Sequence, residues 1–218
     1  MKRKEFNINS IDEILKKKKI QLLLKRIFDF IISSIGLIVL FPIFLIISIF
    51  IKLDSKGPVL FKQVRIGKAG KEFEILKLRT MVVNAEKKGM QITVGKDNRI
   101  TNIGSFLRKY KIDELPQLIN VFKGDMSFVG PRPEVPKYVE LYNENQRNIL
   151  KVRPGITDIA SIEFRNENDL LSKSNNPEKT YIEEIMQKKL MLNEEYIYNI
   201  SIVYDIKIII KTIILVIF

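Results

Sequence analysis

Residues 30–51 read FIISSIGLIVLFPIFLIISIFI, a run of 22 residues without a charged side chain. As an α-helix, a run of this length spans about 33 Å, and the hydrocarbon core of a bilayer is about 30 Å thick. The sequence therefore predicts a membrane segment. Pro42 lies inside it, with twelve uncharged residues before it and nine after it. Because an interior proline removes a backbone hydrogen bond and kinks or breaks a helix, we expect a break at this position.

The flanks of this run are basic on both sides. Residues 1–26 carry nine Lys or Arg against three acidic residues, and residues 52–79 carry eight against three. The positive-inside rule orients a spanning helix by an asymmetry of charge, and here the two flanks do not differ. A helix that enters the bilayer, bends at Pro42 and returns would keep both flanks at the cytoplasmic face. We therefore favour a re-entrant helix over a spanning helix, and over a cleaved signal peptide because the run starts late.

The composition limits the chemistry that the chain can perform. The chain has 218 residues, no cysteine, no histidine and a net charge of +12. Thiol nucleophiles, thiolate metal sites and histidine bases are therefore excluded. The positive charge indicates an anionic partner, such as nucleic acid, anionic lipid or a phosphorylated substrate. A bias of the composition toward lysine explains the same charge equally well.

Short strands and several helices are expected after the membrane segment. Residues 59–61 and 73–76 predict the strands of a hairpin, with Gly67–Gly70 as its turn. The spacing of apolar residues predicts further helices at residues 105–110, 113–123, 134–150, 179–192 and 195–217. Residues 84–102 are expected to form a loop, and residues 166–178 a polar linker.

The expected fold class is α+β: a mainly helical monotopic membrane protein with an N-terminal re-entrant helix-break-helix, a small β-hairpin and interfacial amphipathic helices. We divide the chain into a basic N-terminal tail at residues 1–24, a re-entrant membrane helix at 25–52, and a cytosolic-face catalytic domain at 53–218. Lys207 and Lys211 lie four residues apart among isoleucines, which suits an interfacial helix at the C-terminal end of that domain.

An acidic pair and a rigid arginine lie close together in the sequence. Asp113 and Glu114 fall in the first turn of a predicted helix, where the helix dipole favours a charged carboxylate. A purely structural role as helix N-cap also explains these two residues. Arg132 lies in KGDMSFVGPRP, residues 123–133, between two prolines that restrict its backbone and suit a fixed phosphate contact. Further donors for a phosphate come from Lys77, Arg79, Thr80 and Arg108.

These groups together suit phosphoryl transfer. The reaction depends on positioning and on neutralising charge, and it requires a nucleophile, several cations and a divalent metal ion. Mg²⁺ is usually held by one or two carboxylates together with substrate phosphates. Asp113 and Glu114 are therefore the candidate metal ligands as well as the candidate catalytic residues.

Several segments carry a resemblance to a known family. They are KRIFD at 25–29, GPVLFKQ at 57–63, RIG at 65–67, KLRTM at 77–81, RIT at 99–101, GSFLR at 104–108, DELPQ at 113–117, KGDMSFVGPRP at 123–133 and RPGIT at 153–157, with a weaker match in YDIK at 204–207. In this order and spacing, the chain resembles the small monotopic phosphoglycosyl transferases of the bacterial sugar transferase family. Each segment is weak by itself, and the set is highly specific.

The resemblance implies an activity at the cytoplasmic face of the bacterial inner membrane. The chain would transfer a sugar-1-phosphate from a UDP-sugar to polyprenyl (undecaprenyl) phosphate, as the first membrane step in the biosynthesis of an exopolysaccharide, capsule or glycoconjugate. Asp113 would attack the β-phosphate to form a phosphosugar-aspartate with release of UMP. Glu114 would assist through the metal or a proton, and polyprenyl phosphate would complete a ping-pong cycle.

The resemblance also implies roles for other positions. Substrate phosphates would be bound by Lys77, Arg79, Arg108 and Arg132. The substrate and nucleotide region would contain Thr80, Pro131, Arg153 and Arg165. Pro42 would form the kink of the membrane helix, and Mg²⁺ would be held by Asp113 and Glu114. The implied partners are a UDP-sugar, polyprenyl phosphate and membrane lipid but no nucleic acid, and a homodimer is left open.

The chain departs from the family pattern in two places. Phe41 stands where the family often has serine before the proline, so the kink depends on Pro42 alone. After Thr157 the family often continues Gly-Trp-Ala-Gln, whereas this chain reads DIASIEF at 158–164. If this loop contacts the substrate, the donor sugar differs from the commonest ones.

A rival interpretation is a non-catalytic, membrane-anchored polyanion-binding protein. It is disfavoured because no aromatic stacking platform accompanies the basic residues. The Pro-Arg-Pro run also has no purpose in a protein that binds by charge alone.

Overall fold

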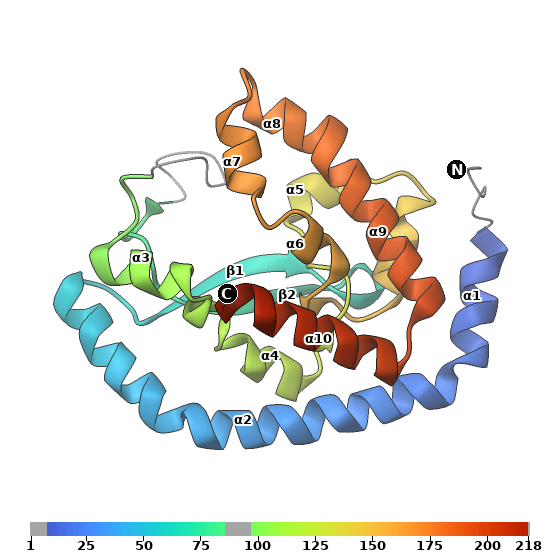
Figure 1. Cartoon of the computed structure of the whole chain (residues 1–218), viewed down its shortest axis with the longest axis horizontal. Coiled ribbons are helices and arrows are strands. Elements are labelled where there is room, and N and C mark those ends of the chain that lie inside the picture. Colours follow the sequence, from blue (N-terminus) through green and yellow to red (C-terminus); the bar gives the residue numbers. More distant parts are fainter. Residues whose placement is uncertain (1–7, 86–96, 218) are drawn as a thin grey trace.

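The computed structural model describes residues 8–85 and 97–217. Residues 1–7 of the predicted tail and residues 86–96 of the predicted loop lie outside this range. The described part is mostly helical and contains two small two-stranded sheets, which confirms the mainly helical fold with a small hairpin. In Figure 1, the long helix α2 (Lys19–Asp54) forms an arc along one side of the molecule, and most other elements lie on its concave side.

The membrane element is one continuous helix. The 36 residues of α2 are helical throughout, and Pro42 lies inside the helix, so the predicted break is absent. Proline removes only one backbone hydrogen bond, and the residues on both sides are supported by the same domain. Ser33 is fully buried before the proline, and Ile51 is almost fully buried after it. Both arms of the helix therefore rest on the domain, and the helix curves rather than breaks.

The residues expected as a basic tail are also helical where they are described. Helix α1 (Ile8–Lys17) precedes α2, whose first turns occupy the rest of the predicted tail. Ile11 on α1 is fully buried, and Lys151 donates a hydrogen bond of 2.8 Å to Asp12. The sequence is amphipathic in this region, and the helix is stabilised because its apolar side packs on the core.

The hairpin is confirmed and is longer than predicted. Strands β1 (Leu60–Ile66) and β2 (Glu72–Leu78) are antiparallel, and the short 3₁₀ turn η1 (Lys68–Gly70) connects them. On the far side of β2 lies α4 (Gln117–Lys123). Asn120 on α4 accepts a hydrogen bond from the Leu76 N–H at 3.0 Å and donates one to the Glu74 carbonyl at 2.8 Å. A side chain therefore pairs the outer edge of the hairpin.

The helix predicted at 105–110 is confirmed with shifted bounds, whereas the helix predicted at 113–123 begins only at Gln117, so the acidic pair does not lie in its first turn. Helix α3 (Asn102–Lys109) is followed by a 3₁₀ turn, η3 (Ile112–Glu114), and then by α4. Lys111 adopts a left-handed conformation with φ of 56° between α3 and η3. Gly124 ends α4 with φ of 93°, as expected for its predicted stop.

A second small sheet holds the Pro-Arg-Pro loop. Strands β3 (Ser127–Val129) and β4 (Gly155–Thr157) are parallel and very close at Gly130 and Gly155. A Cβ atom on Gly155 would lie 2.1 Å from the backbone nitrogen of Gly130. Only glycine allows this approach, which fixes the chain just before Pro131.

The C-terminal half is more segmented than the sequence predicts. Its elements are α5 (Pro136–Val139), η4 (Gln146–Lys151), α6 (Ile159–Glu163), α7 (Glu167–Ser172), α8 (Pro177–Thr180), η5 (Tyr181–Ile185), α9 (Met186–Asn199) and α10 (Ile202–Ile217). The helix predicted at 134–150 is wrong, because Asn143 and Gln146 exchange hydrogen bonds that start a new turn. The linker predicted at 166–178 contains two short helices, the second capped by Asn176.

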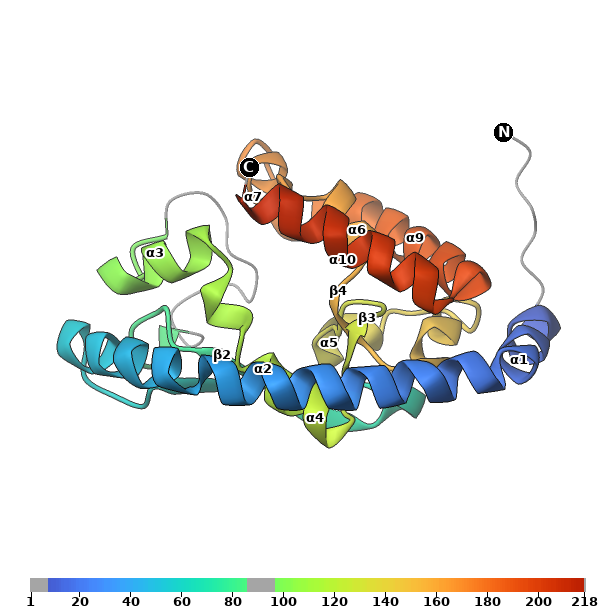
Figure 2. The ribbon, with the colours of Figure 1, turned by 60° about the horizontal axis from the view of Figure 1, so that its bottom comes forward.

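A buried polar network joins α2 to the C-terminal helices. Lys25 on α2 forms an ion pair of 2.5 Å with Asp205 on α10. The Tyr196 hydroxyl on α9 donates a hydrogen bond to Asp205 at 2.7 Å and approaches the Val129 carbonyl of β3 at 3.3 Å. Asp29 on α2 accepts a hydrogen bond of 3.2 Å from the backbone N–H of Phe128. Figure 2 shows α9 and α10 side by side, with β3 and β4 nearby.

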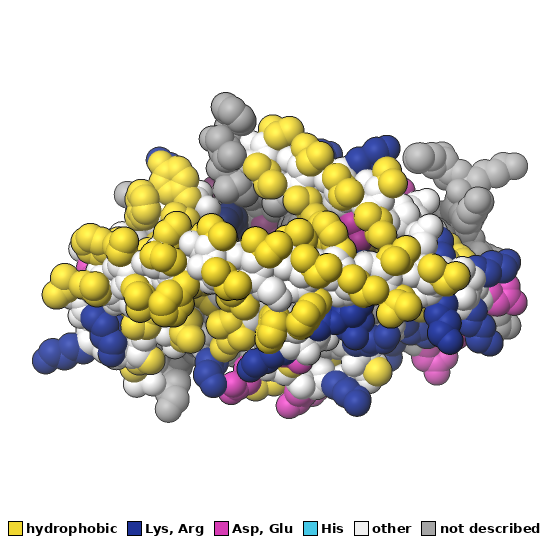
Figure 3. All heavy atoms as spheres, turned by 90° about the horizontal axis from the view of Figure 1, so that it is seen from below, with side chains coloured by type: hydrophobic (Ala, Val, Ile, Leu, Met, Phe, Trp, Pro, Cys, Tyr) yellow, Lys and Arg dark blue, Asp and Glu magenta, His cyan; other side chains and the backbone are white. Residues whose placement is uncertain are grey.

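One face of the molecule is apolar and exposed. Figure 3 shows hydrophobic side chains spread over this face, with basic side chains along one margin. Exposed large apolar residues follow α2 from Ile20 to Leu53, and α10 adds Ile206, Ile210, Ile213 and Ile214. Within the described residues, α2 is the one helix long and apolar enough to cross a bilayer. A patch of this extent is typical of a surface that contacts a membrane or another protein.

We predict that Tyr196→Phe lowers the free energy of unfolding by about 1–3 kcal/mol, because it leaves the buried Asp205 carboxylate without one hydrogen-bond donor. Thermal unfolding followed by circular dichroism measures this change. Tyr204→Phe is the matched control, because within the described residues the Tyr204 hydroxyl forms no hydrogen bond. Equal stability of the two variants would contradict a stabilising role for the network.

Candidate active site

A cavity of about 920 Å³ lies beside the hairpin. It is bounded by β1, the end of β2, α3, η3, the Pro-Arg-Pro loop and residues of α7, η5 and α9. The predicted site residues that line it are Lys77, Arg79, Thr80, Arg108, Asp113, Glu114 and Arg132. Residues far apart in the sequence therefore meet in one cavity large enough for a nucleotide-sized ligand.

Glu114 is the centre of charge in this cavity. One of its oxygens, Oε1, accepts hydrogen bonds from Lys77 at 2.8 Å and from Arg132 at 2.5 Å. Burial alone would raise the pKa of Glu114, but Arg132 and Lys77 hold this pKa well below its usual range. Glu114 therefore remains ionised and keeps two cations side by side.

Asp113 has a different environment from its neighbour. The residue is 7% exposed, and within the described residues its carboxylate forms neither a hydrogen bond nor an ion pair. Burial, followed by the negative charge of Glu114, raises the pKa of Asp113, and the charges of Lys77 and Arg108 oppose the shift. A carboxylate without a committed partner, close to cations, is suited to attack phosphorus in its ionised form.

Arg132 is positioned by its backbone as well as by Glu114. Its N–H donates a hydrogen bond of 3.1 Å to Asp158, which follows β4. The charge of Glu114 raises the pKa of Arg132, and burial opposes the shift. Pro131 lies on the other side of the loop, where its carbonyl accepts a hydrogen bond from Gly155 at 3.0 Å. Pro131 supports the loop and does not line the large cavity.

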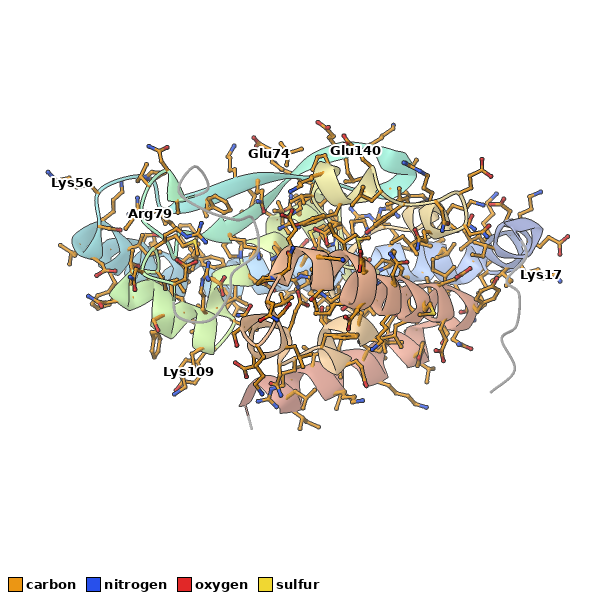
Figure 4. All side chains as sticks on the ribbon, turned by 90° about the horizontal axis from the view of Figure 1, so that it is seen from above. Lys17, Lys56, Glu74, Arg79, Lys109 and Glu140 are labelled. Atoms are coloured by element: carbon orange, nitrogen blue, oxygen red, sulfur yellow. The ribbon has the colours of Figure 1, made fainter. Side chains whose placement is uncertain are left out.

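Arg108 and Arg79 line the cavity in different ways. Arg108 on α3 donates a hydrogen bond of 2.8 Å to the Thr80 hydroxyl, and burial lowers its pKa. Arg79 is 4% exposed and donates hydrogen bonds to the carbonyls of Ser55 at 2.6 Å and Lys56 at 3.0 Å. The Arg79 guanidinium therefore holds the end of α2. Figure 4 shows Arg79 among clustered side chains, whereas Lys109 and Glu140 lie at the edge.

Two predicted residues lie outside the cavity. Arg153 donates a hydrogen bond of 2.8 Å to the Gly124 carbonyl at the end of α4. Arg165 is exposed between α6 and α7. Neither residue is part of the cavity lining in this structure.

The cavity also contains residues that the sequence reasoning did not select. Arg65, Glu134 and Tyr181 line one of its ends, and Arg99 lies at the other. Arg65 and Arg99 fall inside motifs already noted, and Glu134 directly follows the Pro-Arg-Pro run. Tyr181 had no signal in the sequence, because only folding brings η5 to the cavity.

The acidic residues of the cavity suit a metal ion only when a bound substrate supplies further oxygen ligands. Within the described residues, no group of three or more acidic side chains is arranged to hold a metal by itself. Asp113 offers a carboxylate without a partner, whereas one oxygen of Glu114 is shared by two cations. Mg²⁺ often takes one or two carboxylates and completes its shell with phosphate oxygens and water. The residues present fit such a site, with Asp113 as its main protein ligand.

A carboxylate without a partner among the described residues, close to cations, is typical of a site for a phosphorylated ligand, and the exposed apolar helix is typical of a membrane-associated protein. Comparison with known proteins identifies the family. The bacterial sugar transferase family matches residues 20–218, and the chain belongs to this family.

The match covers a different share of each relative's length. The chain is 38% identical over 195 residues to the UDP-glucose:undecaprenyl-phosphate glucose-1-phosphate transferase of Escherichia coli (strain K12), covering 88% of this chain and 39% of that protein. It is 40% identical over 202 residues to the exopolysaccharide production protein PSS of Rhizobium leguminosarum bv. phaseoli, covering 88% and 94%.

A third relative, from Aeromonas hydrophila, is the UDP-N-acetylgalactosamine-undecaprenyl-phosphate N-acetylgalactosaminephosphotransferase. It is 42% identical over 144 residues, which cover 64% of this chain and 34% of that protein. The chain thus spans well under half the length of the Escherichia coli and Aeromonas relatives. The named relatives differ in the sugar that they transfer.

We predict that Glu114→Gln lowers the pKa of Asp113, because it removes a nearby negative charge that raises this pKa. Lys77→Met should raise the pKa of Asp113, because it removes an opposing positive charge. Titration of the Asp113 carboxyl carbon by NMR measures both shifts. Glu140→Gln, at an exposed position, is the control and should leave the titration unchanged. A higher pKa of Asp113 in the Glu114→Gln variant would show that this electrostatic explanation is wrong.

Proposed function

We propose that the chain transfers a sugar-1-phosphate from a UDP-sugar to a polyprenyl phosphate, such as undecaprenyl phosphate, at the cytoplasmic face of the bacterial inner membrane. The products are UMP and a polyprenyl diphosphate sugar, the lipid-linked start of an exopolysaccharide, capsule or other glycoconjugate. The observation that carries the proposal is the Asp113 carboxylate, which lies without a partner among the described residues beside cations held by Glu114. The names of the Escherichia coli and Aeromonas relatives support both substrate classes.

In the first step, an Asp113 oxygen attacks the β-phosphorus of the UDP-sugar. A bond forms between this oxygen and phosphorus, and the bond from phosphorus to the bridging oxygen breaks. The bridging oxygen leaves with its electron pair as part of UMP. Lys77 and Arg108, whose charges act on Asp113, neutralise charge on the phosphates together with Arg132, which Glu114 holds in the same cavity. The product on the enzyme is a phosphosugar-aspartate.

In the second step, an oxygen of polyprenyl phosphate attacks the same phosphorus from the side that UMP has left. The bond to Asp113 breaks, and the carboxylate is restored. Glu114 does not carry a proton in this cycle, because its low pKa keeps it ionised. Its role is to position Lys77 and Arg132 against the transferred phosphate.

The proposed metal is Mg²⁺, which Asp113 and Glu114 would hold together with the phosphates of the donor. Bound there, it would supply additional neutralisation of the diphosphate. Lys77, Arg108 and Arg132 would position the donor without any contribution from the metal.

The shape of α2 supports a monotopic, re-entrant arrangement in the membrane. Near its start, Lys18 donates hydrogen bonds to the carbonyls of Tyr198 and Ile200, and near its end the Ile51 carbonyl accepts one from Arg79. The domain therefore lies along the length of the helix, and a perpendicular crossing would draw polar parts of the domain into the hydrocarbon. A shallow insertion of the convex, apolar side keeps both basic flanks at the same surface.

We predict that wild-type protein releases about one UMP per active site with donor alone, and releases UMP continuously once polyprenyl phosphate is added. Asp113→Asn should abolish both signals, because the amide is not a nucleophile toward phosphorus. The measurement uses protein in detergent or nanodiscs, a panel of UDP-sugars and quench-flow detection of UMP. Asp12→Asn, on the surface of α1, is the control and should retain activity.

The same assay tests the metal and the rival interpretation. EDTA should stop UMP release, and excess Mg²⁺ should restore it. Activity in Asp113→Asn would overturn the covalent mechanism. A folded wild-type protein that binds anionic vesicles but releases no UMP from any donor would favour the non-catalytic polyanion-binding protein.

We predict that both flanks of α2 face the cytoplasm. The chain has no cysteine, so single cysteines at Lys17 and Lys56, which are exposed on either side of the apolar segment, are unique probes. A membrane-impermeant maleimide should label neither variant in intact spheroplasts and both variants after lysis. Labelling of one flank from outside would establish a spanning helix instead.

A further inference from the structure

Three side chains outside the catalytic group form a connected cluster at one end of the cavity. The Tyr181 hydroxyl donates a hydrogen bond to Oε2 of Glu134. Oε1 of the same carboxylate pairs with the Arg65 guanidinium at 3.2 Å and accepts the Val135 N–H at 2.8 Å. Arg65, Glu134 and Tyr181 all line the cavity that contains Asp113. The proposed chemical steps do not use any of them.

The backbone is adapted to bring Tyr181 to this position. Tyr181 begins η5, a turn of π-helix inserted between α8 and α9. Single π-helical turns within helices are rare and are frequent at functional sites. The Tyr181 ring packs against Tyr138 at 5.0 Å between centroids, and the Lys189 ammonium lies 5.4 Å from the Tyr181 ring. Tyr181 is 3% exposed and lines the cavity, so its phenol is held rigidly in the cavity wall.

The two ends of the cavity differ in chemistry. Arg108 lies at the end near Thr80, where it donates a hydrogen bond to the Thr80 hydroxyl, and its positive charge suits a phosphate group. Arg99 lies at the same end and is paired with Asp97 at 2.6 Å. At the other end, the positive charge of Arg65 is paired with Glu134, and a phenol completes the wall. A carboxylate repels a phosphate but accepts hydrogen bonds from hydroxyl groups. This second end therefore suits a neutral, hydroxyl-rich part of a ligand.

The proposed reaction distinguishes the two ends in the same way. The sugar phosphate stays on the protein through both steps, whereas UMP leaves and a lipid phosphate takes its place. The leaving and entering groups both need cations, and the sugar needs hydroxyl recognition. Arg132 connects the two requirements, because it contacts Glu114 and lies two residues before Glu134.

Resting on the proposed function, we infer that Arg65, Glu134 and Tyr181 bind hydroxyl groups of the donor hexose and distinguish one UDP-sugar from another. Glu134 accepts a hydrogen bond from a sugar hydroxyl through its remaining lone pair. The Tyr181 oxygen, whose proton is donated to Glu134, accepts a second. Ribose hydroxyls of the uridine have the same chemistry, and the experiment separates the two.

The test is calorimetric binding with the full chain in nanodiscs, in an Asp113→Asn background that blocks turnover. The ligands are UMP, UDP-glucose, UDP-galactose and their two N-acetylamino counterparts. Tyr181→Phe and Glu134→Gln should each weaken binding of the preferred UDP-sugar about tenfold or more, from the loss of a hydrogen bond to a charged or buried group. Affinity for UMP should change less than twofold, which also shows that the cavity remains folded.

Tyr204→Phe is the control, because Tyr204 lies on α10 and is not part of the lining of the large cavity. It should leave both affinities unchanged. An equal loss for UMP and the UDP-sugars would overturn the inference and assign the cluster to the uridine. No loss for either ligand would reduce the cluster to a structural clamp.

Failure of the proposed function gives a different pattern. If native Asp113 protein releases no UMP, yet the variants selectively lose UDP-sugar affinity, the cluster recognises a sugar in a non-catalytic protein. If no UDP-sugar binds more tightly than UMP even without the substitutions, the hexose makes no useful contact and the inference is wrong.

Discussion

The Glu114 carboxylate is the constraint on which the rest of the site depends, because one of its oxygens holds two cations from distant parts of the chain. Lys77 belongs to the end of β2, and Arg132 follows β3. Two buried cations repel each other unless a negative charge lies between them, and a buried charge is tolerated only when it is paired. Glu114 therefore sets the distance between the hairpin and the Pro-Arg-Pro loop. This leaves Asp113 available for a ligand.

The membrane helix and the site share a strand of three residues. Asp29 on α2 accepts the backbone N–H of Phe128, and Tyr196 on α9 approaches the Val129 carbonyl. Both contacts hold β3 from the side of the apolar face, and the loop that begins after β3 carries Arg132. The position of Arg132 is thus linked by short, buried contacts to the helix that we propose contacts lipid.

The sequence was sufficient where chemistry is local. The acidic pair, the Pro-Arg-Pro run and the hairpin are each specified by neighbouring residues, and the cavity brings the pair together with Arg132 as predicted. It was insufficient where distant contacts decide the outcome. Pro42 remains helical because the domain supports both arms of α2. Residues 134–150 do not form one helix, because Asn143 and Gln146 start a new turn. The π-helical turn that brings Tyr181 to the cavity has no pattern in the sequence.

The ion pair between Lys25 and Asp205 connects residues 180 positions apart and has a consequence for biosynthesis. α2 precedes α10 in the chain, so the ribosome produces α2 before α10. Until α10 is made, Lys25 lacks its counter-charge, and β3 lacks the hydrogen-bonded tyrosine that depends on Asp205. The loop that carries Arg132 is therefore fully supported only after α10 has been translated.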